Sequence, residues 1–185
     1  MSNIFFKLHR YTPIPFIVIA WFFASADPGL QIFGGLLVAT GLLLRFFGAA
    51  YICITLTKND VLITDGPYAF IRNPEYFGNI LIYIGIVIAA GGLLPHLLWI
   101  AVFFFAIQYI SLARYEEKLL ADKFGEEYKQ YLQSVPRFYP RLSPYPERNR
   151  LKGDFNAALR IEKNTLLILI IMVVLFELRW NFITI

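Results

Sequence analysis

The sequence is poor in cysteine and in charge. Its 185 residues include one cysteine, Cys53, which excludes both an intrachain disulfide and a cysteine metal cluster. Charged residues make up 16% of the chain, whereas about a quarter of the residues are charged in a typical soluble domain. Internal repeats and low-complexity tracts are also absent. We therefore expect one domain over residues 1–185, with a composition unlike that of a soluble protein.

The sequence is instead rich in long apolar segments, and 58% of its residues are hydrophobic. Five segments reach, or nearly reach, the roughly 20 residues that a spanning helix needs. Lipid cannot satisfy loose backbone groups, so each span is expected to be helical. The predicted fold class is all-α, a polytopic membrane bundle of about five transmembrane helices. The expected spans are residues 13–26, 30–52, 77–94, 97–113 and 165–185.

Lysine and arginine predict the orientation, because cytoplasmic loops carry an excess of both. With the N-terminus in the cytoplasm, the outer loops around Asp27 and Pro95 contain no positive charge. The basic excess is then a topology signal, and no nucleic-acid partner is expected. The predicted cytoplasmic segments hold most of the 17 Lys and Arg residues: Lys7, Arg10, Lys58, Arg72, Arg114, Lys118, Lys123, Lys129, Arg137, Arg141, Arg148, Arg150, Lys152, Arg160 and Lys163.

The first 26 residues are open to a second interpretation. A basic start, an apolar run and Ala24-Ser25-Ala26 together match the pattern of a cleaved secretory signal. Pro13 and Pro15 near the start of the run, and Pro28 just past the site, argue against cleavage. Removal of this segment would leave the rest of the topology unchanged.

Residues 114–163 are expected to form a cytoplasmic segment that completes a pocket. Leu120, Phe124, Tyr128, Tyr131 and Val135 recur at the spacing of one helix face, and Gly125 should divide that helix. The prolines at 136, 140, 144 and 146 exclude a regular helix there. Residues 148–163 are predicted to form a basic amphipathic helix on the membrane surface.

Isolated polar residues within the spans are candidates for function. Arg45 lies inside the second span, where a charge should face protein or water. Gly34, Gly35, Gly41 and Gly48 on that span permit close helix contact. His9 and His96 are expected near opposite membrane faces, so no metal site is predicted.

Two polar clusters flank the third and fourth spans. Residues 66–78 precede the third span, and Arg114-Tyr115-Glu116-Glu117 follows the fourth. Because the two spans form a hairpin, both clusters should lie on one side of the membrane. Adjacent Glu116 and Glu117 project about 100° apart on a helix. One is expected to face the pocket and the other to pair with Arg114 or a lysine.

Several motifs follow one another around this hairpin: Asp65-Gly66-Pro67-Tyr68, Arg72-Asn73-Pro74-Glu75-Tyr76-Phe77-Gly78, Glu116-Glu117, Phe124-Gly125-Glu126-Glu127-Tyr128 and Val135-Pro136. In this order they resemble the isoprenylcysteine carboxyl methyltransferases and related phospholipid N-methyltransferases. The resemblance covers about residues 36–140, and the span at 165–185 lies outside it.

The resemblance implies S-adenosyl-L-methionine as cofactor and a pocket facing the cytoplasm. Arg72 and Asn73 can hold its carboxylate, and Glu116 or Glu117 its ammonium group. Tyrosine rings suit its sulfonium cation. Pro136 and Arg137 form a second group of candidates. The predicted catalytic residues are Glu117, Arg72 and Arg45, and the predicted cofactor-binding residues are Tyr68, Arg72, Asn73, Tyr76, Gly85, Glu116, Glu117, Tyr128 and Tyr131.

Asn73 departs from the pattern of the resembling family, which has histidine there. Asparagine keeps hydrogen-bonding capacity but cannot titrate near neutrality. A position that only holds cofactor would tolerate this change, whereas one that handles a proton would not.

We expect the methyl acceptor to be a lipid or an isoprenoid. O-methylation of a carboxylate is the reaction that we favour. Membrane lipids are also expected partners. N-methylation of phospholipid amines and S-methylation of thiols are alternative reactions, since an ammonium acceptor needs a base such as Glu117 and a carboxylate does not. Two further hypotheses are a sterol-reductase-like NADPH enzyme and a non-catalytic membrane scaffold.

Overall fold

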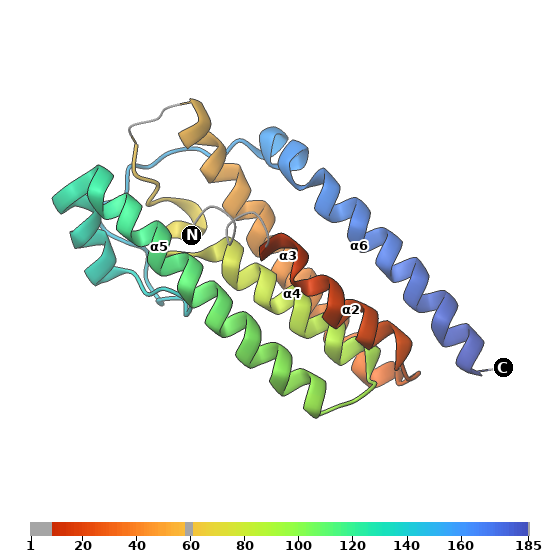
Figure 1. The fold of residues 1–185 in the computed structure, drawn as a ribbon. Helices are drawn as coiled ribbons and strands as arrows, with labels where there is room; N and C mark the ends of the chain where they lie inside the picture. The colour runs from red at the N-terminus through yellow and green to blue at the C-terminus, as the bar shows by residue number, and fades with distance from the viewer. Residues whose placement is uncertain (1–8, 58–60, 185) are drawn as a thin grey trace. The chain divides into compact units, whose positions relative to one another are not determined.

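The computed structural model describes residues 9–57 and 61–184, and these residues are arranged as helices joined by turns (Figure 1). Across these described ranges there is no strand, which confirms the all-α prediction. Lys7 and Lys58, which the orientation argument uses, lie outside the described residues. The α-helices are α2 (Pro13–Phe22), α3 (Pro28–Thr57), α4 (Pro74–Ala90), α5 (His96–Ser134) and α6 (Phe155–Thr184), with short 3-10 helices η1 (His9–Tyr11) and η2 (Gly66–Ala69).

Three of these helices are long and apolar enough to cross a membrane. They are α3, α5 and α6, and α4 adds a shorter apolar helix of 17 residues. Helix α2 has 10 residues and therefore rises only about 15 Å, about half of a typical hydrocarbon core. The chain is thus an integral membrane protein, and its first predicted span is the shortest.

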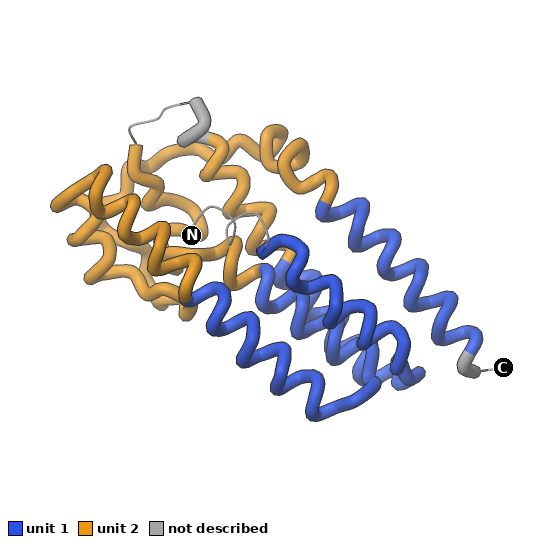
Figure 2. The backbone as a smooth tube through the Cα atoms, in the orientation of Figure 1, with its two compact units in different colours: residues 1–41, 79–110, 165–185 blue, residues 42–78, 111–164 orange. Residues whose placement is uncertain are grey.

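The chain divides into two compact units (Figure 2). Unit 1 comprises residues 1–41, 79–110 and 165–185, and unit 2 comprises residues 42–78 and 111–164. Helices α3, α4, α5 and α6 each contribute residues to both units, whereas α2 belongs to unit 1 alone.

Unit 1 is packed through small residues and aromatic rings. Gly34 on α3 meets Gly85 on α4 so closely that a Cβ atom at Gly85 would lie 2.6 Å from the Gly34 carbonyl oxygen. This contact confirms that glycine brings the helices together. The Phe105 ring packs between Phe16 and Tyr83, with ring centroids 5.0 and 4.7 Å away.

The two loops predicted to be free of positive charge meet within unit 1. The Ser25 amide, in the connection between α2 and α3, donates to the Ala90 carbonyl at the end of α4 at 2.8 Å. Both connections therefore lie at the same end of the helices, as the predicted topology requires.

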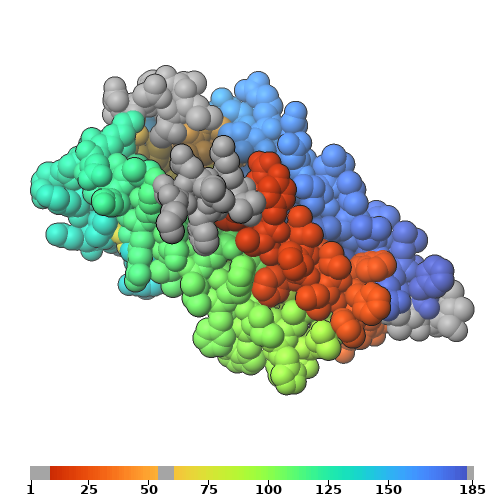
Figure 3. Space-filling model, viewed as in Figure 1, coloured from red at the N-terminus to blue at the C-terminus, as the bar shows by residue number. Residues whose placement is uncertain are grey.

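Helix α6 exposes most of its apolar side chains in unit 1. Its atoms form the blue part of the surface in Figure 3. Its contact with α2 includes a hydrogen bond of 3.0 Å from the Trp21 indole to the Leu175 carbonyl. Arg179 donates to the Phe22 carbonyl at 3.0 Å. Exposed apolar residues on a membrane helix are suited to contact with lipid.

Unit 2 contains a folded segment after α5. The helix reverses at Gly125, whose φ of 55° and ψ of −121° suit glycine, and this confirms the predicted division. Beyond the kink, Tyr128, Tyr131 and Val135 are buried together with Leu62 and Tyr145. The Tyr131 hydroxyl donates to the Tyr68 carbonyl at 2.7 Å, which ties the segment to η2.

The surface helix predicted over residues 148–163 is wrong in its first seven residues and in being a separate helix, whereas residues 155–163 are helical. Residues 150–154 are not helical, and α6 begins at Phe155 and continues into the last span. Asp65 explains why the helix starts later than predicted. Its carboxylate accepts hydrogen bonds from the backbone N–H groups of Arg150 and Leu151, both at 2.9 Å. The Asp154 carboxylate then accepts the Ala157 N–H at 2.9 Å, which places the helix start after this residue.

Candidate active site

A cavity of about 380 Å³ lies in unit 2. Its volume falls within the roughly 300–1,000 Å³ of small-molecule sites. The cavity wall combines the segment before α4, the first turn of α4 and both parts of α5 around Gly125. Its polar lining residues are Tyr68, Arg72, Asn73, Glu75, Tyr76, Glu116, Glu117, Lys123, Tyr128 and Tyr131.

Glu117 is the centre of a charge cluster in this wall. The Arg137 guanidinium donates to both Glu117 oxygens, through Nη2 at 2.6 Å and Nε at 2.8 Å. Arg72 Nη1 lies 3.3 Å from Glu117 Oε1 on the other side. Bidentate pairing of this kind fixes a carboxylate in place. Hydrogen bonding to Glu117 also raises the pKa of Arg137, which therefore stays charged.

The expectation that only one of the two glutamates faces the pocket is wrong, because both line the cavity. Glu117 pairs with Arg72 and Arg137 rather than with Arg114 or a lysine. The partners come from segments that flank α5 in space, and the helical spacing alone could not predict them.

Arg72 carries unused hydrogen-bonding capacity. Its side chain is 9% exposed, and neither Nε nor Nη1 has a hydrogen-bond partner. The backbone holds it in place, because the Arg72 N–H donates to the Pro136 carbonyl at 2.9 Å. An unsatisfied buried donor costs about 1–3 kcal/mol, and more when charged, so a ligand acceptor here would be favourable.

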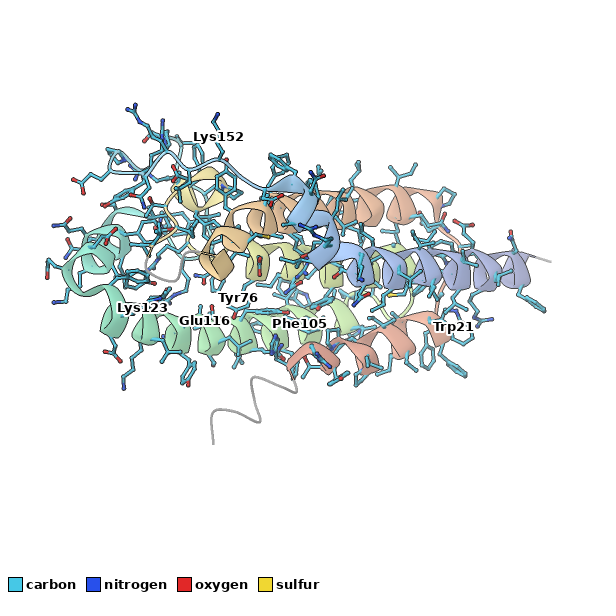
Figure 4. All side chains as sticks on the ribbon, turned by 90° about the horizontal axis from the view of Figure 1, so that it is seen from above. Trp21, Tyr76, Phe105, Glu116, Lys123 and Lys152 are labelled. Atoms are coloured by element: carbon cyan, nitrogen blue, oxygen red, sulfur yellow. The ribbon has the colours of Figure 1, made fainter. Side chains whose placement is uncertain are left out.

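Glu116 is held by a tyrosine. The Tyr76 hydroxyl donates to Glu116 Oε1 at 2.5 Å, and the two side chains lie together in Figure 4. No hydrogen bond to the second carboxylate oxygen occurs among the described contacts of Glu116. Glu116 can therefore accept a hydrogen bond from a cationic group in the cavity.

The remaining tyrosines form an uncharged part of the wall. Burial raises the pKa of Tyr68 well above its usual value and that of Tyr128 to about 12, so both hydroxyls stay protonated at neutral pH. The Tyr128 and Tyr131 rings lie 6.0 Å apart. Asn73 Nδ2 reaches the Arg137 carbonyl at 3.5 Å, a long contact that leaves its oxygen available.

Arg45 and Gly85 are predicted site residues that do not line the cavity. Arg45 forms a bidentate pair with Glu162 of α6, with Nη2 2.7 Å from Oε1, inside unit 2. Gly85 packs against Gly34 and Val38 in unit 1, where it permits a close contact between α3 and α4.

Sequence reasoning did not select Glu75, which lines the cavity. Its position was a usable signal, since it follows the Arg72-Asn73-Pro74 motif and lies in the first turn of α4. Among the described residues, no group of three or more His, Cys, Asp or Glu side chains could hold a metal ion.

Comparisons with known proteins identify the family of this chain. The phospholipid methyltransferase family matches residues 29–127. The cobalt-zinc-cadmium resistance protein CzcN of Cupriavidus metallidurans is 35% identical over 127 residues, which cover 68% of this chain and 56% of that protein. The protein-S-isoprenylcysteine O-methyltransferase of Schizosaccharomyces pombe is 36% identical over 86 residues, which cover 46% and 35% of the two chains.

The nickel-cobalt-cadmium resistance protein NccN of Alcaligenes xylosoxydans xylosoxydans is 35% identical over 101 residues, covering 54% of this chain and 44% of that protein. The matches thus span about half the length of these relatives or less. No solved structure matches the chain. The family match extends over more than half of the sequence and includes most of the cavity wall, and the chain therefore belongs to the phospholipid methyltransferase family of membrane methyltransferases, which includes isoprenylcysteine methyltransferase-like proteins.

Proposed function

We propose that this chain transfers a methyl group from S-adenosyl-L-methionine to a lipidic or isoprenoid acceptor at the cytoplasmic face of the membrane. The observation that carries the proposal is Arg72, a buried guanidinium in the wall of a ligand-sized cavity, whose Nε and Nη1 atoms form no hydrogen bond although Nη1 lies near Glu117. Family membership supports methyl transfer, and the choice of donor rests on the fit of the wall to its charged groups.

The wall offers complementary groups to each charged part of that donor. Arg72 can bind the carboxylate through Nε, which forms no hydrogen bond within the protein, and the open oxygen of Glu116 can accept a hydrogen bond from the ammonium group. An aromatic face such as that of Tyr128 attracts a sulfonium cation through its ring quadrupole. When bound, the donor supplies an electrophilic methyl group.

The residues of the chain have mainly positional roles in this proposal. Arg137 and Arg72 hold Glu117 in place, and Tyr76 holds Glu116, so that the wall is arranged before a ligand binds. Such preorganisation contributes to catalysis by bringing reacting atoms into line and by excluding water.

The acceptor would enter from lipid and the donor from the aqueous side. The name of the Schizosaccharomyces pombe relative supports an isoprenoid carboxylate, and the family description supports a phospholipid. The distribution of lysine and arginine supports a cytoplasmic site, since Arg72, Lys123 and Arg137 all surround the cavity region.

Isothermal titration of the detergent-purified protein with S-adenosylhomocysteine tests the donor. We expect a dissociation constant in the micromolar range, and at least a tenfold loss of affinity for Glu116→Gln, since Gln retains an acceptor for Tyr76 but no charge. Glu126→Gln is the matched control, because Glu126 is exposed on the same helix and pairs with Lys129. Binding of NADPH without binding of S-adenosylhomocysteine would instead favour a reductase.

A further inference from the structure

A second cavity of about 490 Å³ lies in unit 2, and it shares no lining residue with the cavity of the candidate active site. Its wall is formed by the C-terminal part of α3, by η2 and by the connecting segment, residues 144–151, which precedes α6 (Figure 1). Its volume falls within the range of small-molecule sites. The polar lining side chains are Tyr51, Asp65, Arg148 and Arg150.

The connecting segment is held in place by hydrogen bonds. The Tyr145 N–H donates to the Ala69 carbonyl at 2.9 Å, and the Asp65 carboxylate accepts the N–H groups of Arg150 and Leu151. Arg150 has a φ of 56°, which is uncommon for a residue other than glycine, so these bonds hold a conformation that it rarely adopts alone. The segment therefore presents its side chains from a fixed backbone.

Asp65 is the acidic residue of this wall, and its charge is already compensated. Its two carboxylate oxygens accept one backbone N–H each, both at 2.9 Å, and the residue is only 3% exposed. Such charge-assisted hydrogen bonds stabilise a carboxylate strongly. The charge left for a ligand of the cavity is therefore the positive charge of Arg148 and Arg150.

Three hydrogen-bond donors of the wall are available to a ligand. Within the described residues, the guanidinium groups of Arg148 and Arg150 and the hydroxyl of Tyr51 form no hydrogen bond or ion pair. The Tyr51 ring is held between two glycines, since a Cβ atom at Gly66 would overlap it and one at Gly153 would lie 3.1 Å from Cε2. Two like charges in one cavity repel each other, so an anion between them would be favourable.

The surrounding chain is also basic. Residues 141–154 contain four basic residues and two acidic ones. Glu147 accepts the Tyr145 hydroxyl at 3.3 Å, and Asp154 accepts the Ala157 N–H at the start of α6 at 2.9 Å. Neither carboxylate lines the cavity, so neither takes the place of an anionic ligand there.

An apolar surface follows directly in the chain. The Asp154 N–H donates to the Ala50 carbonyl of α3 at 2.7 Å, and α6 begins at the next residue, Phe155. The Phe155 ring is 44% exposed and lies 5.9 and 5.8 Å from the rings of Phe46 and Phe47. The protein thus places an anion-binding cavity beside the start of an apolar membrane helix.

We propose that the cavity between Arg148 and Arg150 binds a phosphate group, and that this phosphate belongs to the headgroup of an anionic membrane phospholipid. Arginine binds phosphate oxygens through paired N–H groups, and the Tyr51 hydroxyl supplies a third donor. Basic residues next to a membrane helix attract anionic headgroups. The lipid is a bound ligand in this proposal rather than a methyl acceptor, and the proposal does not depend on the proposed function.

Native mass spectrometry of the detergent-purified full chain tests this site with lipids of defined composition. Phosphatidylglycerol and phosphatidylcholine both carry a phosphate diester, but choline adds a cation that the two arginines repel. We expect phosphatidylglycerol to bind at least tenfold more tightly and to raise the unfolding midpoint. Equal affinities for the two lipids would overturn the proposal. Binding of inorganic phosphate without any preference for phosphatidylglycerol would overturn the assignment to a lipid and favour a soluble phosphate.

The double variant Arg148→Gln/Arg150→Gln locates the bound lipid. Its affinity for phosphatidylglycerol should fall about 30-fold, in line with the contribution of two basic residues beside an anionic headgroup. The matched control is Arg114→Gln/Lys118→Gln, which removes the same charge from exposed positions of α5 outside both cavities and should change the affinity less than threefold. Equal losses in the two double variants would show a general effect of net charge and overturn the site.

Tyr51→Phe separates binding from folding. It keeps the ring and removes a hydroxyl that forms no hydrogen bond with the described residues, so the unfolding midpoint of the lipid-free protein should not change. The affinity for phosphatidylglycerol should fall about tenfold, as expected for a hydrogen bond to a charged group. Unchanged affinity would overturn the assignment of Tyr51 as a ligand. The affinity of all these variants for S-adenosylhomocysteine should stay constant, and its absence in the parent protein would refute the proposed function without affecting this site.

Discussion

Unit 1 and unit 2 bury different kinds of side chain. Of the polar residues that are buried in the described chain, Gln108 belongs to unit 1, whereas Thr64, Asp65, Glu117 and Glu162 belong to unit 2. Unit 1 has aromatic rings and small residues where its helices meet. Unit 2 has ion pairs, buried arginine nitrogens that form no hydrogen bond, and a cavity lined by charged side chains.

The two units differ because apolar contacts and buried charges are favourable in different surroundings. Packing of apolar groups and glycine contacts suffices where helices lie in lipid. Buried charges are retained when they bind a partner or perform chemistry, because their burial is costly. Substitutions in unit 1 should therefore change stability alone, whereas substitutions in the cavity of unit 2 should change stability and ligand binding together.

Among the substitutions considered, Glu117→Gln should have the largest effect on stability and ligand binding. It would leave Arg72 and Arg137 beside a neutral amide, and breaking a buried ion pair typically costs about 3–5 kcal/mol. We expect a lower thermal unfolding midpoint in detergent and loss of measurable S-adenosylhomocysteine binding. If the variant kept the stability and the affinity of the parent protein, Glu117 would not have the central role assigned to it here.

Arg45 and Glu162 test whether a buried charge in unit 2 can be purely structural. Arg45→Met alone should cost about 3–5 kcal/mol, because it leaves the Glu162 carboxylate buried and unpaired. The double variant Arg45→Met/Glu162→Leu should recover most of that loss, since both charges are removed. Thermal unfolding of the single and double variants measures this coupling.

Methyl-labelling of the same double variant addresses the prediction that Arg45 has a catalytic role. A stable double variant with a parental rate would mean that the ion pair serves only the fold. A stable double variant with a lost rate would assign Arg45 to the acceptor instead.

Gly34→Ala is the corresponding test in unit 1. Its Cβ atom would lie 2.5 Å from the Ala89 backbone nitrogen, and backbone cannot move aside as a flexible side chain can. Overpacking of this kind costs about 1–3 kcal/mol. The unfolding midpoint should fall while the S-adenosylhomocysteine affinity of the folded protein stays constant. The matched control, Gly35→Ala, should be neutral, because no atom lies within 4 Å of its Cβ.

Tyr131→Phe should have the smallest effect. It removes the hydrogen bond to the Tyr68 carbonyl and keeps the ring, at a cost of about 0.5–1.5 kcal/mol. We expect a small drop in unfolding midpoint, together with a modest loss of S-adenosylhomocysteine affinity as η2 loosens. A parental midpoint and affinity would show that packing alone holds the segment after Gly125.

Several features were predictable because they depend on local pattern. Apolar length predicted the helical fold, and the position of Gly125 predicted the break in α5. The order of the motifs predicted the family and the convergence of Arg72, Glu116 and Glu117 on one cavity. The helix predicted at 148–163 failed because Asp65, far away in sequence, binds the backbone of Arg150 and Leu151.

The helical segments, and the charged residues near or within them, could be identified from the amino-acid sequence alone, because both depend on side-chain chemistry and local spacing. Which charges are satisfied depends on how distant segments pack together. Arg137 reaches Glu117 because the chain reverses at Gly125, and Arg45 is held by Glu162 from α6. Pairing of this kind depends on distance in space rather than in sequence.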